Sequence, residues 1–261
     1  MRKIRFETML PDELLAERDR SGIAYLPVGS MEWHGPHMAM GMDTFNAYAV
    51  AQGAAQQTGG VVLPPLYIGT ETPRSPQVLQ KLGFTGEEHI VGMDFPQNSV
   101  KSFYWPKELF EQILRCQTQM LCDMGFRHIV LLNGHGADQQ VEILGRIARE
   151  LTQSTQKTVQ SLFALFDDCG AGVGHAGLVE TAIMQHLCPQ GVELSRLPPQ
   201  PQKIYTAQYG IADSETFEKG PTADFSVRYD PRDATPALGE KLVAHAVKRC
   251  VEQVMAAHPG A

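Results

Sequence analysis

The stretch GSMEWHGPHMAMGMDT, residues 29–44, places carboxylate and imidazole side chains among glycine, proline and methionine. Glu32 and His34 are two positions apart, so in an extended backbone their side chains point the same way. The Gly-Pro pair that follows prevents a helix, and a later glycine lets the chain turn back and bring Asp43 near the same point. Nitrogen and oxygen donors that meet in this way are what a divalent metal ion requires.

Two later stretches carry the same residue types. His135 lies between glycines in LLNGHGADQQ, directly after an apolar run, and His175 and Glu180 flank the start of a helical pattern in GHAGLVETA. Ligands of parallel α/β sheets gather at the carboxyl ends of the strands. We therefore expect the three stretches to converge on one sheet edge. The predicted metal ligands are Glu32, His34, Asp43, His135 and Glu180.

Charge counting favours two metal ions over one. Two divalent cations bring four positive charges, which three carboxylates and one bridging hydroxide would balance. Asp43 is the predicted bridging carboxylate. A hydroxide held between two cations about 3.5–4 Å apart is a nucleophile at neutral pH. None of the five cysteines is near these stretches, which excludes a thiolate site and leaves Zn²⁺ and Mn²⁺ as the expected cofactors.

Structural alternatives exist for several of these residues. A single buried histidine is more often a hydrogen-bonded core residue than a ligand. Glu180, at a helix start, could simply complement the helix dipole. His37 is expected to orient a ligand or to pack, because the ligand set is already full. His89 could contact substrate or cap its loop.

The rest of the chain alternates strand-like and helix-like segments. Strands are predicted at 23–28, 60–69 (broken by two prolines), 128–134 and 159–166. Helices are predicted at 44–59, 106–126, 137–153, 177–189 and 236–258. This alternation predicts βαβ units, hence an α/β fold with a mostly parallel central sheet and helices on both faces. No linker or repeat interrupts it, so residues 1–261 are expected to form one domain.

Residues 70–105 contain proline, glycine, asparagine and charged residues, and they show no periodic pattern. A long irregular segment in a compact domain is often a lid over a site or an interface arm. Its charged side chains could form a solvated face or bind a polar, hydroxyl-rich substrate. Arg74, Glu88 and His89 are the predicted substrate-binding residues.

The composition excludes several other functions. The net charge of −7 argues against a nucleic-acid partner, which would require a basic surface. The odd number of scattered cysteines suggests buried thiols in a reducing compartment. There is no apolar stretch of the roughly 20 residues that a membrane span needs, and no signal peptide is visible. The expected protein is cytoplasmic, with a small-molecule substrate and no membrane partner.

The three stretches LPVGSMEWHGPHMAMGMDT, NGHG and HAGLVET, in this order, resemble the creatininase family, and DPRDATPALGEKL (230–242) resembles a late element of that family. The resemblance implies a three-layer α/β/α sandwich, a binuclear metal centre and a homo-oligomer, usually a hexamer. It also implies that Glu32, His34, Asp43 and His135 are metal ligands. His175 matches a residue that shuttles protons beside the substrate, and Glu180 matches the acid of the third stretch.

The sequence departs from the family pattern at three places. Ala137 stands where creatininase itself has a glutamate that binds metal, so that role would pass to Glu180 or to water. Ala171 and Gly172 replace an aromatic clamp and an acid before His175. A long insertion separates Gly69 from His89.

These departures predict a substrate other than creatinine. The expected activity is metal-dependent hydrolysis of a small cyclic amide or related ring, in which a metal-bridged hydroxide attacks the carbonyl. A cyclic polyol ketone (an oxidised inositol) and a formamide are alternative substrates. A non-catalytic relative that keeps the metal for structure is the alternative of a different class.

Overall fold

The computed structural model describes residues 2–165, 174–212 and 229–258. These residues include a five-stranded sheet built from β1 (Ile23–Gly29), β2 (Val61–Val62), β3 (Leu66–Tyr67), β4 (His128–Asn133) and β5 (Thr158–Phe163). The strands run in the order β2-β1-β4-β5, and β3 also pairs with β1. All pairings between these strands are parallel. The predicted α/β class with a mostly parallel sheet is confirmed.

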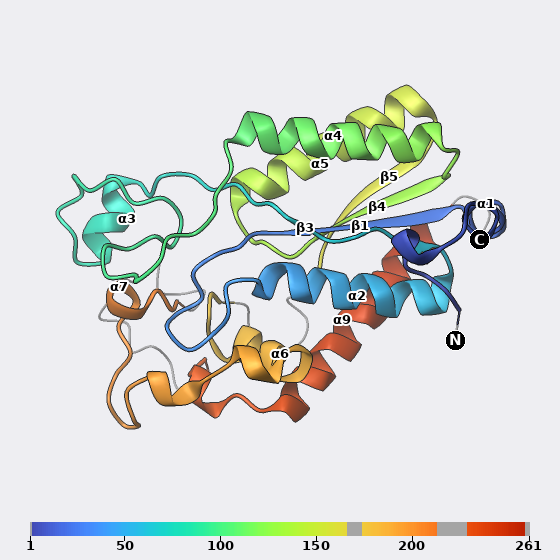
Figure 1. Cartoon of the computed structure of the whole chain (residues 1–261). Helices are drawn as coiled ribbons and strands as arrows, with labels where there is room; N and C mark the ends of the chain where they lie inside the picture. The colour runs from blue at the N-terminus through green and yellow to red at the C-terminus, as the bar shows by residue number, and fades with distance from the viewer. Residues whose placement is uncertain (1, 166–173, 213–228, 259–261) are drawn as a thin grey trace.

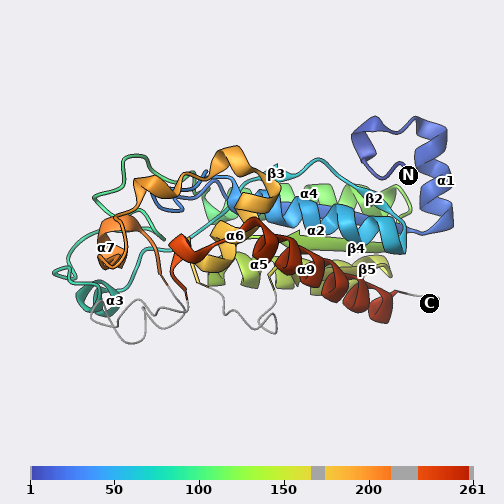
Figure 2. The same cartoon turned by 90° about the horizontal axis from the view of Figure 1, so that it is seen from below.

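Helices cover both faces of the sheet (Figure 1). The helices are α1 (Pro11–Arg20), α2 (Met42–Thr58), α3 (Pro76–Lys81), α4 (Lys107–Asp123), α5 (Asp138–Thr155), α6 (Leu178–Leu187), α7 (Thr206–Tyr209) and α9 (Pro236–Ala257). α4 and α5 lie on one face, and α2 and α9 lie on the other, with α6 beside them (Figures 1 and 2). The order helix, sheet, helix is the predicted three-layer sandwich.

β1 and β4 are completely buried because both faces of the sheet are covered. Successive side chains of a strand point to opposite faces, and here they enter two separate core clusters. Leu26 and Leu131 pack with the apolar residues of α4 and α5. Tyr25 and Val130 pack with those of α2 and α9. Continuous apolar runs, in place of an alternating pattern, are typical of such central parallel strands.

Residues 60–69 form two short strands on either side of Pro64-Pro65, as the predicted break requires. Val61 pairs with Ala24, and Leu66 pairs with Val28, four positions further along β1. Proline has no N–H to donate to a ladder. The two prolines therefore divide the strand without removing it from the sheet.

The structure contains elements that the sequence pattern does not predict. α1 begins at Pro11, and the Glu13 carboxylate accepts a hydrogen bond from Leu10 N at 2.9 Å. Its apolar positions are too few to give a clear helical period. α3 is a six-residue helix inside the 70–105 segment, capped by Ser75, whose Oγ accepts a hydrogen bond from Val78 N. Segment 70–105 also has its own apolar cluster, in which Phe84 and Phe95 stack.

This segment and α7 lie at one end of the sheet, beyond the carboxyl end of β1, and α1 lies at the opposite end (Figures 1 and 2). No helix within the described ranges is long and apolar enough to cross a membrane.

Candidate metal centre

The loop between β1 and α2 brings its polar side chains to the carboxyl end of the sheet. Glu32 and His34 follow β1 directly, and Asp43 lies in the first turn of α2. Gly29 makes this close approach feasible, because a β-carbon built on it would lie 2.6 Å from Thr44 N. Glu32, His34 and Asp43 are all buried.

Asp43 faces two histidines with its two oxygens. Its Oδ1 lies 3.3 Å from Nε2 of His34, and its Oδ2 lies 3.1 Å from Nδ1 of His135. His135 comes from the loop after β4, so the contact joins two strand ends. Glu32 Oε2 lies 3.0 Å from the same Nδ1 of His135. Asp43 is thus shared by two groups of donor atoms, one that contains His135 and one that contains His34.

Glu180, in the first turn of α6, completes the second group. Its Oε2 lies 3.6 Å from His34 Nε2. Donor atoms that share one tetrahedral Zn²⁺ at about 2.0–2.1 Å lie about 3.3 Å apart. The histidine–carboxylate spacings in the groups Glu32–Asp43–His135 and His34–Asp43–Glu180, 3.0–3.6 Å, are close to that value, and in each group the donor atoms lie within 4.8 Å of one another. The residues therefore fit two divalent cations.

The orientation of His34 also fits a metal ligand. Its Nδ1 lies 3.0 Å from the backbone oxygen of Glu32, and a carbonyl only accepts hydrogen bonds, so Nδ1 carries a proton. Its Nε2 is buried and has no hydrogen-bond partner within the described part of the chain, although two carboxylates are near. A backbone hydrogen bond that fixes the tautomer and leaves the other nitrogen free is usual for a ligating histidine.

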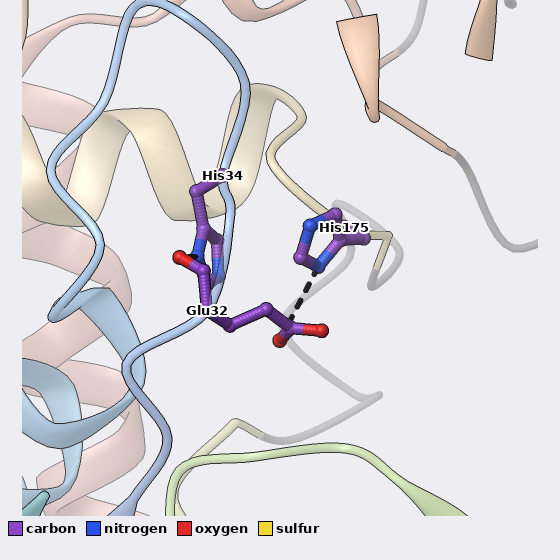
Figure 3. Close-up of side chains that lie close together, drawn as sticks. All are labelled: Glu32, His34 and His175. Atoms are coloured by element: carbon purple, nitrogen blue, oxygen red, sulfur yellow. Dashed lines mark hydrogen bonds and ion pairs between the residues drawn. The ribbon is translucent and has the colours of Figure 1, made fainter. Parts of the chain in front are cut away.

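His175 lies beside the two groups. Its ring centroid is 4.4 Å from that of His34, and its Nδ1 is 3.8 Å from Glu32 Oε2. Figure 3 shows the Glu32 carboxylate pointing toward this nitrogen. The other nitrogen, Nε2, lies 2.6 Å from the carbonyl oxygen of Trp33. His175 can also form a third donor group, with Glu32 and His34, so geometry alone allows it to be a ligand.

Two hydroxyl groups hold the carboxylates in place. Ser30 Oγ donates to Asp43 Oδ2 at 2.6 Å, and Tyr104 Oη donates to Glu32 Oε1 at 2.5 Å. Neither residue was predicted from the sequence as part of the site. Ser30 lies within the first stretch and could have been found from its place beside Glu32. Tyr104 lies in the unassigned segment, where no local pattern marks it.

The electrostatics of the site favour negative carboxylates and bound cations. Burial by itself would raise the pKa of the Glu32 carboxyl, but the charges of His135 and His175 lower it to about 2. Burial opposes ionisation of Asp43 too, yet the neighbouring histidines hold its pKa well below the usual range. Burial would lower the pKa of His34, but the carboxylates of Asp43 and Glu180 raise it to about 10. The negative charges that favour a proton on His34 would equally attract a metal ion.

For three residues near the centre, burial is the largest cause of the change in pKa. It raises the pKa of Glu180 to about 7 and lowers the pKa of His175 to about 4. Burial also lowers the pKa of His37 to about 3, with the charges of His34 and His175 acting in the same direction. His37 Nε2 lies 3.0 Å from Thr181 Oγ1, outside the donor groups. His37 thus ties the first stretch to α6, and its expected role in orienting a ligand or packing stays a prediction.

A cavity of about 450 Å³ opens onto these donors. Its lining residues are Glu32, Asp43, His135, His175 and Glu180 at the donor groups, and Glu71, Thr72, Arg74, Met93, Gly136, Ala137, Asp138, Phe163 and Gly174 around them. The wall therefore mixes charged, apolar and very small side chains. Ala137 has no side-chain donor atom, and the Glu180 carboxylate lies in the group that contains His34 and Asp43; the predicted transfer of the glutamate's role to Glu180 or to water stays a prediction.

The three predicted substrate-binding residues do not share one location. Arg74 lines the cavity, and its Nε donates to Gly92 O at 2.8 Å. Glu88 folds onto its own turn, where its carboxylate accepts hydrogen bonds from Thr85 N and Gly86 N at 3.0 and 2.9 Å. His89 is exposed, and neither Glu88 nor His89 lines the cavity. The substrate-binding role of these two residues stays a prediction, and the structure places both outside the lining of this cavity.

Ala171 and Gly172, the predicted replacements of the aromatic clamp and the acid, lie outside the described residues.

The family model described as creatinine amidohydrolase matches residues 7–254. The chain therefore belongs to the creatininase family, as the three stretches predicted, and it is a hydrolase of that family.

Curated relatives differ in what they act on. The chain is 28% identical over 201 residues to the creatinine amidohydrolase of Pseudomonas putida, which covers 70% of this chain and 71% of that protein. It is 25% identical over 257 residues to the mycofactocin precursor peptide peptidase of Mycobacterium ulcerans, with coverages of 90% and 85%. It is 27% identical over 142 residues to the 3-dehydro-scyllo-inosose hydrolase of Thermotoga maritima, with coverages of 54% and 38%.

Solved structures confirm the fold. A creatininase mutant of Zn-Zn type matches with a TM-score of 0.68 and 21% identity, covering 99% of this chain and 100% of the other. A creatininase in its Mn form matches with a TM-score of 0.67, the same identity and the same coverage.

Proposed function

We propose that this protein is a divalent-metal-dependent hydrolase of an amide or related carbonyl in a small substrate. The observation that carries the proposal is the position of Asp43, whose two oxygens face His34 and His135 separately. A carboxylate in this position could contribute one oxygen to each of two cations. The Zn-Zn and Mn forms of similar creatininases support the same choice of metals.

Glu32, Asp43 and His135 would hold one cation, and His34, Asp43 and Glu180 would hold the other. Cations bound there would polarise the substrate carbonyl and make water acidic enough to attack it at neutral pH. Three carboxylates leave one positive charge of the pair to be balanced by substrate or solvent.

His175 would transfer a proton from the attacking water to the leaving nitrogen of the substrate. Its Nε2 must donate to the Trp33 carbonyl, so in the neutral ring Nδ1 carries the lone pair and faces Glu32 and the cavity. A base fixed in this tautomer can take a proton from water and return it to the leaving nitrogen. The alternative, in which His175 is a ligand, differs in that its loss would release metal.

The cavity wall bears on the choice of substrate. The wall provided by Gly136 and Ala137 has little side-chain bulk, and Phe163 and Met93 add apolar surface. A flat cyclic amide, a formamide, an oxidised inositol and the end of a peptide are the candidates. The near full-length match to a peptide peptidase favours adding short peptides to this set.

The test begins with metal content. Elemental analysis of the purified protein after mild dialysis should give close to two divalent ions per chain, and chelation should lower the thermal midpoint until Zn²⁺ or Mn²⁺ is returned. The loaded protein is then assayed on creatinine, cyclic amides, formamides, oxidised inositols and short peptides. Metal content near zero, with no uptake of added Zn²⁺ or Mn²⁺, would refute the binuclear centre.

A further inference from the structure

Tyr104 reaches the metal centre from a segment more than sixty residues away from Glu32 in the sequence. The chain around it is fastened on both sides. Phe103 N donates to Met31 O at 2.8 Å, and Trp105 N donates to Gly69 O at 2.7 Å. Residues 103–105 therefore run beside the residue that precedes Glu32, and Tyr104 has little freedom to move.

The hydroxyl of Tyr104 makes two hydrogen bonds of opposite sense. It accepts from Met93 N at 3.2 Å, and a backbone N–H can only donate, so the hydroxyl proton is free to point elsewhere. That proton goes to Glu32 Oε1 at 2.5 Å. The loop closes tightly on the phenol oxygen of Tyr104, because a β-carbon built on Gly92 would lie 2.4 Å from Tyr104 Oη and 2.5 Å from Glu71 Cγ.

The two oxygens of Glu32 consequently have different surroundings. Oε1 is held by Tyr104, whereas Oε2 lies 3.0 Å from His135 Nδ1. From this difference we infer that Tyr104 is a positioning residue that holds Glu32 as a ligand through one oxygen only. The inference rests on the proposed metal centre and extends it to a residue outside the donor groups.

The same hydroxyl also joins the centre to the cavity wall. The Tyr104 hydroxyl accepts a hydrogen bond from the N–H of Met93, which lines the cavity. The carbonyl oxygen of the neighbouring Gly92 accepts a hydrogen bond from Arg74 Nε. Removal of the hydroxyl should therefore disturb both the donor set and the wall that faces the substrate.

The experiment compares two matched substitutions. Tyr104→Phe removes only the hydroxyl, and Tyr25→Phe removes a similarly hydrogen-bonded hydroxyl, whose Oη lies 2.7 Å from Thr58 Oγ1 in the core. Zn²⁺ affinity is measured by competition with a chromophoric chelator. The protein reconstituted with Co²⁺ is examined by visible absorption, which depends on the coordination of the ion.

Tyr104→Phe should weaken Zn²⁺ binding about 10–100-fold, the usual effect of losing a group that holds a ligand, and it should change the Co²⁺ spectrum. Tyr25→Phe should leave the affinity and the spectrum unchanged while lowering the thermal midpoint. If Tyr104→Phe binds Zn²⁺ like the wild type with the same Co²⁺ spectrum, the inference is wrong and the metal centre stands. If the wild type itself takes up no metal, the proposed centre fails and the inference fails with it.

A second pair of variants covers the case in which Tyr104→Phe does not fold. Gly92→Ala keeps the phenol but crowds its oxygen, and also the flexible side chain of Glu71, whereas Gly83→Ala has a similar left-handed backbone with no atom within 4 Å of the added β-carbon. Zn²⁺ affinity should fall in Gly92→Ala and not in Gly83→Ala. Equal affinities in these two variants would overturn the inference.

Discussion

The backbone of Gly134 is packed directly against that of Asp43: a β-carbon built on Gly134 would lie 1.9 Å from the Asp43 carbonyl oxygen. The start of α2 therefore rests on the loop after β4, and this contact sets the distance between Asp43 and His135. The glycine after His135 differs, since the nearest atom to a β-carbon at Gly136 is Phe163 Cζ at 3.6 Å.

Gly134→Ala should accordingly destabilise the protein and disturb the metal centre. Because the clash is with backbone, the cost should be at least that of ordinary overpacking, roughly 1–3 kcal/mol. Urea unfolding of the metal-free protein and metal content give the two readouts. Gly136→Ala is the matched control and should change the stability little, so equal losses in both variants would contradict the role given to this contact.

Asp43→Asn should remove both metal ions and nearly all turnover, because the amide cannot supply two anionic oxygens to two cations. Elemental analysis and activity are measured together. Asp138→Asn, which alters an exposed carboxylate on the cavity wall, should retain two ions per chain. Full metal content in Asp43→Asn would reduce Asp43 to a helix-start carboxylate.

His175→Ala should keep its metal and lose turnover by roughly 10²–10⁴-fold, the usual contribution of a positioned general acid or base. Metal content and kcat on an identified substrate provide the check, with His89→Ala, an exposed histidine away from the cavity, as the unaffected control. Loss of metal in His175→Ala would make it a ligand, and unchanged kcat would make it structural.

Glu17 gives the stability of the fold a pH dependence away from the metal centre. Burial would raise the pKa of its carboxyl, but hydrogen bonds from Arg20 and from Gly60 N lower it below the ordinary 4.5. A lowered pKa in the folded state contributes stability that is complete above the unfolded value and is lost as the pH falls through the folded value.

Glu17→Gln should therefore reduce the free energy of unfolding at pH 7 and flatten its decline below about pH 4.5, where the ordinary value lies. Urea unfolding of the metal-free protein over a pH series measures this. Glu142→Gln, an exposed change on α5, is the control. A decline in Glu17→Gln as steep as in the wild type would show that other carboxylates carry the acid sensitivity.

The sequence alone determined the layers of the fold and the donor groups at its edge. Continuous apolar runs in β1 and β4 reflect burial on both faces, and each helix predicted on those faces is present within a few residues. The three stretches converge because parallel strands deliver their following loops to one edge. That rule depends on local pattern and chain order, both of which are written in the sequence.

Only the tertiary structure decided what surrounds those donors. Tyr104 meets Glu32 because backbone hydrogen bonds to Met31 and Gly69 fasten residues 103–105 beside the first stretch, and backbone groups are the same in every non-proline residue. Glu88 was predicted to face substrate, yet its carboxylate is satisfied by the N–H groups of its own turn. Contacts of an irregular segment have no period, so the side chains that reach the site are selected by packing between segments distant in the chain.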